Sequence, residues 1–367
     1  MITNGWLFDI YHLKDRIILW IKEKNGNVKR LEYPWSPSIY VASDTKDELS
    51  SLMRNSKILS FVKQYEFENR FEYPSDNNKR EVLKLTVNDS SQIVSLAKNI
   101  EKLCKRFGHY RLYNVDISPE QTFLYEKDIY PLGFYGVGGK LTESNGHKFD
   151  LFNNDNDSID SFDYAIPSFK FLSFDIISEK KTISNNFNDK ISMIRVNIFG
   201  KHNDIKEKFL ISEDTELETI LEFSYEINRI NPDIILTTGG DQFLFPHLLH
   251  RAKISKIEAQ LLVNLNRELN QDFIQRKNKY LLEINSADNS NLSSSASFIS
   301  YGKVYFKPRP FFLYGRVHID TNTSFIYEDN GLDGLSEISR ICRMPLQLAS
   351  RSTIGKCLSS LYFYNAQ

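Results

Sequence analysis

Strand-like and helix-like segments alternate between residues 169 and 253, and this alternation is the feature that most constrains the fold. The segments are residues 169–177, 194–198, 215–230, 234–237 and 243–253. Thr215 and Glu218 are spaced as a capping box at the start of the longest helix-like segment, and Pro232 is placed to end it. Because strands joined through helices form sheets covered by helices, this stretch predicts an α/β or α+β sheet domain.

The first third of the chain has a different pattern. Residues 6–42 and 59–87 hold short runs of β-branched and aromatic side chains, which predict strands. Residues 90–107 instead repeat apolar side chains at helical spacing, and Gly108 stands at the expected end of that helix. We therefore predict a mixed, β-rich N-terminal domain with one amphipathic helix. The fold class of the whole chain is then α/β, in the mixed α+β sense.

Two polar segments suggest where the chain divides. Residues 145–163 are acidic and rich in asparagine, which is typical of a linker or exposed loop. Residues 286–300 contain seven serines, which predicts a flexible loop because such a run cannot form a core. A length of 367 residues suggests two or three domains. We therefore predict a division into residues 1–145, 146–337 and 338–367.

Charge and composition exclude several classes of protein. The formal net charge is −1 at pH 7, so any contact with nucleic acid must come from local patches. No run approaches the roughly 18 apolar residues of a membrane span, and no secretion signal is recognisable at the start. The three cysteines lack the CxxC spacing of a zinc site and favour a reducing compartment, so we expect a cytoplasmic protein without a membrane segment.

Two patterns that resemble binding motifs fail on spacing. Gly136 and Gly139 precede Lys140, but Phe134 stands where a phosphate-binding loop needs glycine, and Leu141 replaces its Ser or Thr. We therefore interpret Gly136–Lys140 as a mobile loop. His247 and His250 have a spacing that permits metal binding, yet no Cys, Asp or Glu on the same helix completes a site. A surface or packing role is the better interpretation of this pair.

Two aspartates occupy positions that suit metal chemistry. Asp175 lies near the end of the strand-like sequence FLSFDII, and Asp241 follows a strand and a glycine turn. Two-metal phosphoryl chemistry needs several carboxylates that converge on a pair of divalent cations, and strand ends can supply them. The alternative is that both are ordinary turn aspartates, and spacing alone favours that alternative.

The chain resembles the N-terminal and exonuclease region of the family B DNA polymerases. The resemblance lies in YPWSPSIYVASD (33–44), YNVDISPEQTFLYEKDIYPLG (113–133), FLSFDII (171–177), NPDIILTTGGDQFLFPHLLHRA (231–252), YGRVHID (314–320) and the Arg-Ser-Thr-x-Gly pattern at 351–355. Their shared order makes the resemblance fairly specific. It implies that residues 1–145 are the polymerase N-terminal domain, 146–337 an RNase H-like 3′–5′ exonuclease-type domain, and 338–367 the start of the palm.

The departures from the family pattern fall on the exonuclease motifs. Asp175 matches the family's catalytic aspartate, but Ile177 replaces its glutamate. Gly239 replaces the asparagine of the second motif, and Leu244 replaces its metal-binding aspartate. The third motif has no clear counterpart, although Asp329 and Asp333 are candidates by position. Because too few carboxylates remain to hold two divalent ions, the resemblance implies an inactivated exonuclease with no metal site.

This pattern resembles an archaeal lineage of family B polymerases that is described as inactivated, in which a segment like Gly331–Glu337 also occurs. The resemblance implies that the chain needs a palm-containing partner or a missing C-terminal half, and that Mg²⁺ serves only the complete polymerase. The ligand is then template or single-stranded DNA, in replication or repair. A last stretch without acidic residues supplies the candidate DNA contacts, which are Arg340, Arg343, Arg351 and Lys356.

Two alternatives stay open at this point. One is an active metal-dependent exonuclease whose carboxylates are displaced to residues such as Asp320, Glu328 or Asp329. The other is a standalone single-stranded DNA-binding protein that associates with no palm subunit.

Overall fold

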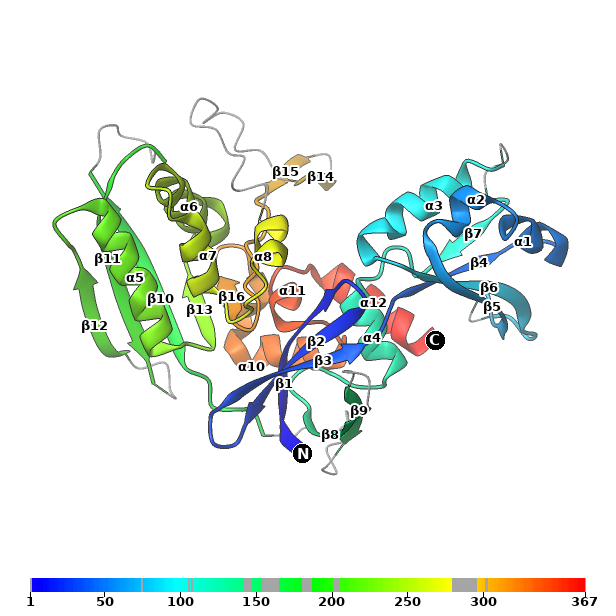
Figure 1. Cartoon of the computed structure of the whole chain (residues 1–367), viewed down its shortest axis with the longest axis horizontal. Coiled ribbons are helices and arrows are strands. Elements are labelled where there is room, and N and C mark those ends of the chain that lie inside the picture. The colour runs from blue at the N-terminus through cyan, green and yellow to red at the C-terminus, as the bar shows by residue number, and fades with distance from the viewer. Residues whose placement is uncertain are drawn as a thin grey trace. The chain divides into compact units, whose positions relative to one another are not determined.

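The structure is a computed structural model (Figure 1), which describes residues 2–73, 75–104, 106, 108–141, 147–153, 165–179, 187–200, 205–278, 296–300 and 303–366. The chain divides into two compact units. The first comprises residues 1–164, 338–345 and 354–367, and the second comprises residues 165–337 and 346–353. No helix in the described segments is both long and apolar enough to cross a membrane.

The first unit contains an antiparallel five-stranded sheet. Its strands are β1 (Ile2–Leu13), β2 (Arg16–Glu23), β3 (Val28–Pro34), β8 (Phe134–Leu141) and β9 (His147–Asn153), in the order β3-β2-β1-β8-β9. Leu7, Ile17 and Leu19 pack with Phe123 and Leu124 of α4 (Pro119–Glu126) in its core.

Two loop predictions are wrong in this sheet. Gly136–Lys140 belongs to β8, which pairs with β1 on one side and β9 on the other, so both edges of its backbone are hydrogen-bonded. Residues 147–153 of the predicted acidic linker form β9. Residues 154–163 of that linker, and the predicted domain boundary at residue 145, lie outside the described residues.

A second sheet of the first unit follows a β-α-β-β-α-β chain order. It holds β4 (Ser38–Ala42), β5 (Val62–Arg70), β6 (Arg80–Val87) and β7 (Arg111–Tyr113), in the order β5-β6-β4-β7. Helices α1 (Lys46–Leu52), α2 (Ser56–Leu59) and α3 (Ile93–Glu101) supply one side of the core, in which Leu49, Ile58 and Ile100 pack against strand residues such as Val41 and Leu85. The predicted helix is therefore present but ends at Glu101, before Gly108.

The second unit is built on a five-stranded mixed sheet. Its strands are β10 (Phe171–Ser178), β11 (Ile191–Phe199), β12 (Ile205–Ile211), β13 (Ile234–Thr237) and β16 (Val317–Asp320), in the order β12-β11-β10-β13-β16. The pairs among β10, β11 and β12 are antiparallel, whereas β10 with β13 and β13 with β16 are parallel. The predicted mixed α/β architecture, with a β-rich first part, is confirmed.

Helices α5 (Glu216–Ile230), α6 (Phe245–Ile254), α7 (Glu258–Leu265) and α8 (Gln271–Lys277) also belong to this unit. The predicted capping box is present, because Thr215 and Glu218 bond reciprocally at the start of α5. The helix ends at Asn231, which is left-handed, one residue before Pro232. The end of the predicted serine-rich loop forms strand β14 (Ala296–Ser300), which pairs with β15 (Lys303–Lys307), so this part of the loop prediction is wrong. Residues 286–295 of the predicted loop lie outside the described residues.

The predicted third segment does not form a unit of its own. Helix α10 (Phe325–Ile341) bends at Gly331, whose φ is 63°. Helix α11 (Leu346–Ser350) belongs to the second unit, where Gln347 bonds the backbone of Leu313 and His318. Helix α12 (Ile354–Ala366) belongs to the first unit, where the hydroxyl of Tyr125 donates to the carbonyl of Ser360. Within this segment, α11 therefore makes polar contacts inside the second unit, and α12 makes a polar contact inside the first unit.

Candidate functional site

Asp175 lies on the central strand of the mixed sheet, on the face opposite to helix α5. Strand residues alternate between faces, and Phe174, its neighbour, contacts Phe223 of α5 with ring centroids 4.9 Å apart. Asp175 is therefore turned away from α5, and its side chain is exposed. Ile177 lies two residues further along β10 on the same face and is partly buried. The position next to Asp175 that could hold a second ligand is thus apolar.

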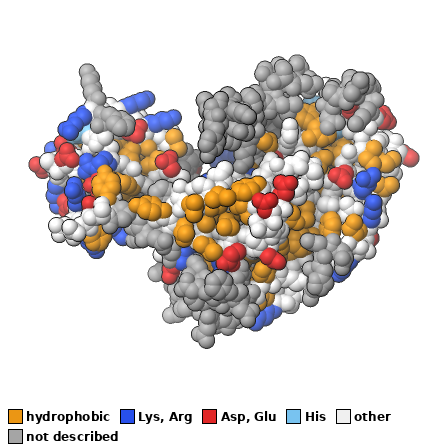
Figure 2. Space-filling view, turned by 180° about the vertical axis from the view of Figure 1, so that it is seen from behind, with side chains coloured by type: hydrophobic (Ala, Val, Ile, Leu, Met, Phe, Trp, Pro, Cys, Tyr) orange, Lys and Arg blue, Asp and Glu red, His pale blue; other side chains and the backbone are white. Residues whose placement is uncertain are grey.

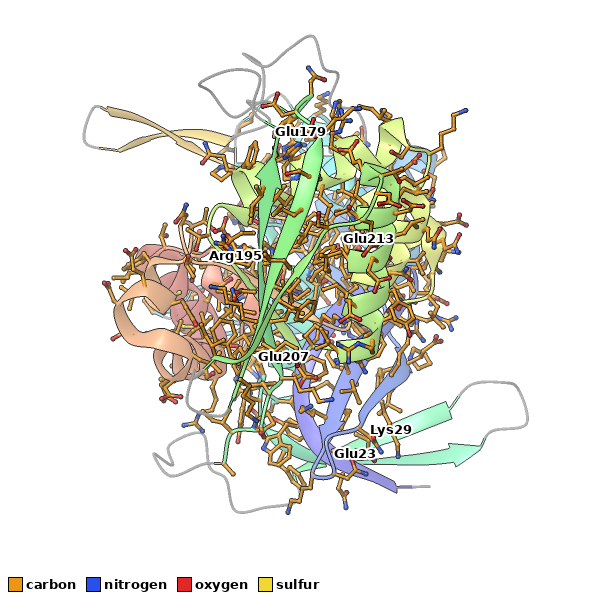
Figure 3. All side chains as sticks on the ribbon, turned by 90° about the vertical axis from the view of Figure 1, so that its left-hand side faces the viewer. Glu23, Lys29, Glu179, Arg195, Glu207 and Glu213 are labelled. Atoms are coloured by element: carbon orange, nitrogen blue, oxygen red, sulfur yellow. The ribbon has the colours of Figure 1, made fainter. Side chains whose placement is uncertain are left out.

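Arg195 of β11 stands directly opposite Asp175 in the antiparallel pairing. Figure 3 labels Arg195 on its strand. The Cβ atoms of such opposed residues are about 4.5–5.5 Å apart, so both side chains project from the same patch of sheet. Within the segments that the structure describes, neither side chain makes a hydrogen bond or an ion pair. An arginine is therefore the cross-strand neighbour of this carboxylate on the sheet.

The glycine turn after β13 is sterically demanding. Gly239 has a φ of 79°, a left-handed conformation that costs most side chains free energy. A Cβ atom on Gly240 would lie 2.0 Å from Oγ1 of Thr237 and 2.8 Å from Nε2 of His318. A short π-helix, η2 (Gly240–Leu244), follows and leads directly into α6. Leu244 is 6% exposed, so the position matched to a metal-binding aspartate presents a buried apolar side chain.

The carboxylate of Asp241 binds several residues of its own unit. Its two carboxylate oxygens accept from Nε and Nη2 of Arg351, at 3.1 and 3.2 Å. They also accept from the amide of Phe311 at 2.8 Å and the hydroxyl of Thr323 at 3.1 Å. Burial alone would raise the pKa of Asp241, but the charge and hydrogen bonds of Arg351 hold that pKa below its ordinary value. Asp241 is therefore a structural anion with its oxygens occupied.

Asp320 accepts hydrogen bonds from the backbone of the glycine turn. Its oxygens accept from the amides of Gly239 at 2.8 Å, Asp241 at 2.9 Å and Asn322 at 3.2 Å. Burial, with a further contribution from the charge of Asp241, raises the pKa of Asp320. Its side chain is fully enclosed, and both of its oxygens accept from backbone amides, which argues against the alternative in which Asp320 is a displaced metal ligand.

Burial likewise lowers the pKa of His318 to about 3, so the ring is neutral at physiological pH. Its Nδ1 lies 2.7 Å from the carbonyl of Phe311, and its Nε2 lies 2.7 Å from the hydroxyl of Thr237. The ring thereby joins the end of β13 to β16. Sequence reasoning missed this role of His318, although every residue of Val317–Asp320 is buried and a buried polar side chain requires a partner.

Three of the four residues predicted to contact DNA are buried, so the prediction is wrong for these three. Arg351 binds Asp241, as described. Arg343 donates to the carbonyl of Ile129 at 2.8 Å and to Asp128 at 2.7 Å. Arg340 is 1% exposed, with its guanidinium 5.6 Å from the ring centre of Tyr130. Arginines held in this way do not present their charge to a phosphate. Lys356 is exposed, and its contact with DNA stays a prediction.

The remaining candidates do not assemble into a metal site among the described residues. Glu328 and Asp329 are exposed on α10. No group of three His, Cys, Asp or Glu side chains within the described segments could hold a metal ion. His247 and His250 are buried beside Phe187, at ring distances of 6.0 and 6.3 Å, and burial lowers the pKa of both. They have the packing role that the sequence favoured.

Comparison with known proteins finds one family model that matches part of the chain and a solved structure with a similar fold. Residues 110–292 match the model of the exonuclease domain of DNA polymerase family B. The chain is similar to the structure of the family B DNA polymerase from the hyperthermophilic archaeon Pyrobaculum calidifontis, with a TM-score of 0.66 and 14% sequence identity. That match covers 99% of this chain and 50% of the archaeal chain, so the protein spans about half the length of its structural relative. No curated protein sequence matches the chain.

Proposed function

Because the chain carries the N-terminal and exonuclease-type region of a family B DNA polymerase, we propose that it binds template DNA for such a polymerase and does not proofread. The observation that carries this proposal is the composition of the face around Asp175. One exposed carboxylate remains there, its neighbour along the strand is Ile177, and its neighbour across the sheet is Arg195.

Charge explains why such a face would not cleave DNA. Two divalent cations need several carboxylates to bind and neutralise them. Here Arg195 adds a positive charge to the same patch of sheet as Asp175, and two like charges about 4 Å apart repel by about 1 kcal/mol even in water. Asp241 and Asp320 cannot substitute, since backbone amides, Thr323 and Arg351 already occupy their oxygens. The domain then serves as a scaffold that holds DNA.

Nucleotide transfer would come from a separate palm-containing subunit or from a C-terminal half, and Mg²⁺ would act only in that complete polymerase. The proposal is supported by the match, which spans half of the archaeal polymerase. The three free cysteines fit work in the cytoplasm. A polymerase of this kind, like the inactivated archaeal lineage, would suit synthesis past damaged template during repair.

Co-purification tests the partnership directly. The chain would be isolated under native conditions from its source cells, and the associated proteins would be identified by mass spectrometry. A stoichiometric partner with the paired palm aspartates, or a longer native chain that contains them, is the expected result. Recovery of the chain alone at its present length would instead favour a standalone DNA-binding protein.

A further inference from the structure

An edge strand of the first unit presents a row of exposed aromatic rings. Strand β5 lies at one end of the order β5-β6-β4-β7, and Tyr65 and Phe67 on it are 48% and 37% exposed. Phe71 and Tyr73 follow just after the strand and are 51% and 49% exposed. Figure 2 shows hydrophobic side chains mixed with charged ones over this part of the unit, at the left of the view. Positions 65, 67, 71 and 73 are aromatic, with Asn69 between the two pairs, and this clustering is more than scattered surface exposure explains.

Glu72 holds the end of this row in place. Its side chain is enclosed, and it accepts from the Arg111 guanidinium and, at 2.7 Å, from the hydroxyl of Tyr113. Since Glu72 points inward, its neighbours Phe71 and Tyr73 are turned toward solvent. The amide of Asp76 also donates to the carbonyl of Tyr73 at 3.0 Å, which closes the turn.

Lysines accompany the rings. The ammonium of Lys46 lies 5.2 Å from the ring centre of Phe67, and that of Lys79 lies 5.5 Å from the ring centre of Phe71. Lys63 is exposed at the start of the strand, next to Tyr65. Neither Lys63 nor Lys79 forms an ion pair with a carboxylate within the described residues. Cations that lie beside exposed rings match a ligand with alternating bases and phosphates.

We propose that this aromatic row, Tyr65, Phe67, Phe71 and Tyr73, is a stacking platform for single-stranded DNA. The bases would stack on the rings, and Lys63 and Lys79 would neutralise phosphates. The bulge between Val62 and Gln64 and the charged residues along β5 oppose pairing with a protein strand. The two glutamates of the strand are themselves paired with Lys84 and Arg70. This inference rests on the proposed function, because both require that the chain bind DNA.

Fluorescence anisotropy of a labelled oligodeoxynucleotide of about 16 nucleotides, the upper site size of a single-strand binding fold, tests the inference. Phe71→Ala and Tyr65→Ala should each weaken binding about fivefold or more, since a stacked base is worth about 1–3 kcal/mol. Tyr225→Ala is the matched control, because Tyr225 is a 60% exposed ring on α5 of the other unit. Its affinity should equal that of the wild type.

The outcomes separate the two proposals. If the wild-type chain does not bind the oligonucleotide, both the proposed function and the platform are wrong. If the wild type binds and the platform variants match Tyr225→Ala, only the platform is wrong. Thermal unfolding of each variant should match the wild type, because exposed side chains contribute little to stability.

Discussion

Asp175 and Arg195 face each other across the pairing of β10 with β11, so the carboxylate on this face has an arginine as its cross-strand partner. Both lie on the face away from α5, and Ile177 lies beside them. Metal ions at this face would meet one negative and one positive side chain, which together offer no net attraction.

Replacement of Arg195 should therefore improve metal binding once a second acid is present. Ile177→Glu places a carboxylate two residues from Asp175 on the same face. We expect the double variant Ile177→Glu, Arg195→Gln to bind Mn²⁺ about fivefold more tightly than Ile177→Glu alone, for a repulsion of about 1 kcal/mol. Isothermal titration calorimetry measures both affinities. Equal affinities would show that Arg195 does not disfavour cations here.

The pair formed by Arg351 and Asp241 should be important for stability. Arg351→Ala leaves a buried carboxylate without its bidentate partner, and breaking such a pair costs about 3–5 kcal/mol. Urea unfolding measures the loss. Lys208→Ala, at an exposed basic residue of β12 in the same unit, is the control and should change the free energy of unfolding by less than about 0.5 kcal/mol. A small effect of Arg351→Ala would mean that Asp241 is held by its other donors alone.

The same aspartate gives a pH dependence with a definite sign. The pKa of Asp241 in the folded chain lies below its ordinary value of 3.8, so ionisation stabilises the folded state above that pH. That stabilisation is lost as the pH falls below 3.8 toward the folded-state pKa. Asp241→Asn should thus be less stable than the wild type at neutral pH, and the difference should shrink in acid. A difference in unfolding free energy that stays constant down to acid pH would contradict this assignment.

Lys356 gives a prediction about DNA. Because its side chain is exposed, Lys356→Ala should weaken DNA binding similarly for all sequences and reduce the slope of log affinity against log salt by about 1. A salt titration of anisotropy reports this slope. If the slope is unchanged, Lys356 does not contact phosphate.

The sequence predicts those features whose causes are local. Thr215 and Glu218 are three residues apart, so their capping box is legible without the fold, and α5 begins where the spacing predicts. The local pattern of Gly136–Lys140 does not reveal that it is a strand, because its order comes from pairing with β1 and β9.

The features of the candidate site also separate into those with local causes and those that depend on distant contacts. Loss of carboxylates at Ile177 and Leu244 can be read from the motifs themselves. The opposition of Asp175 and Arg195 depends on the register of a hairpin, and the pairing of Asp241 with Arg351 joins residues 110 positions apart. Without knowledge of those contacts, the sequence around Arg351 predicts a surface cation, and its burial cannot be foreseen.

An electrophoretic mobility-shift experiment in Mn²⁺ tests the central claim most directly, because one gel reports both binding and cleavage of 5′-labelled single-stranded DNA. The account predicts a shifted band and DNA of unchanged length, the same for the wild type and for Asp175→Ala. Shortened products that appear with the wild type and vanish with Asp175→Ala would contradict it, and so would the absence of any shift.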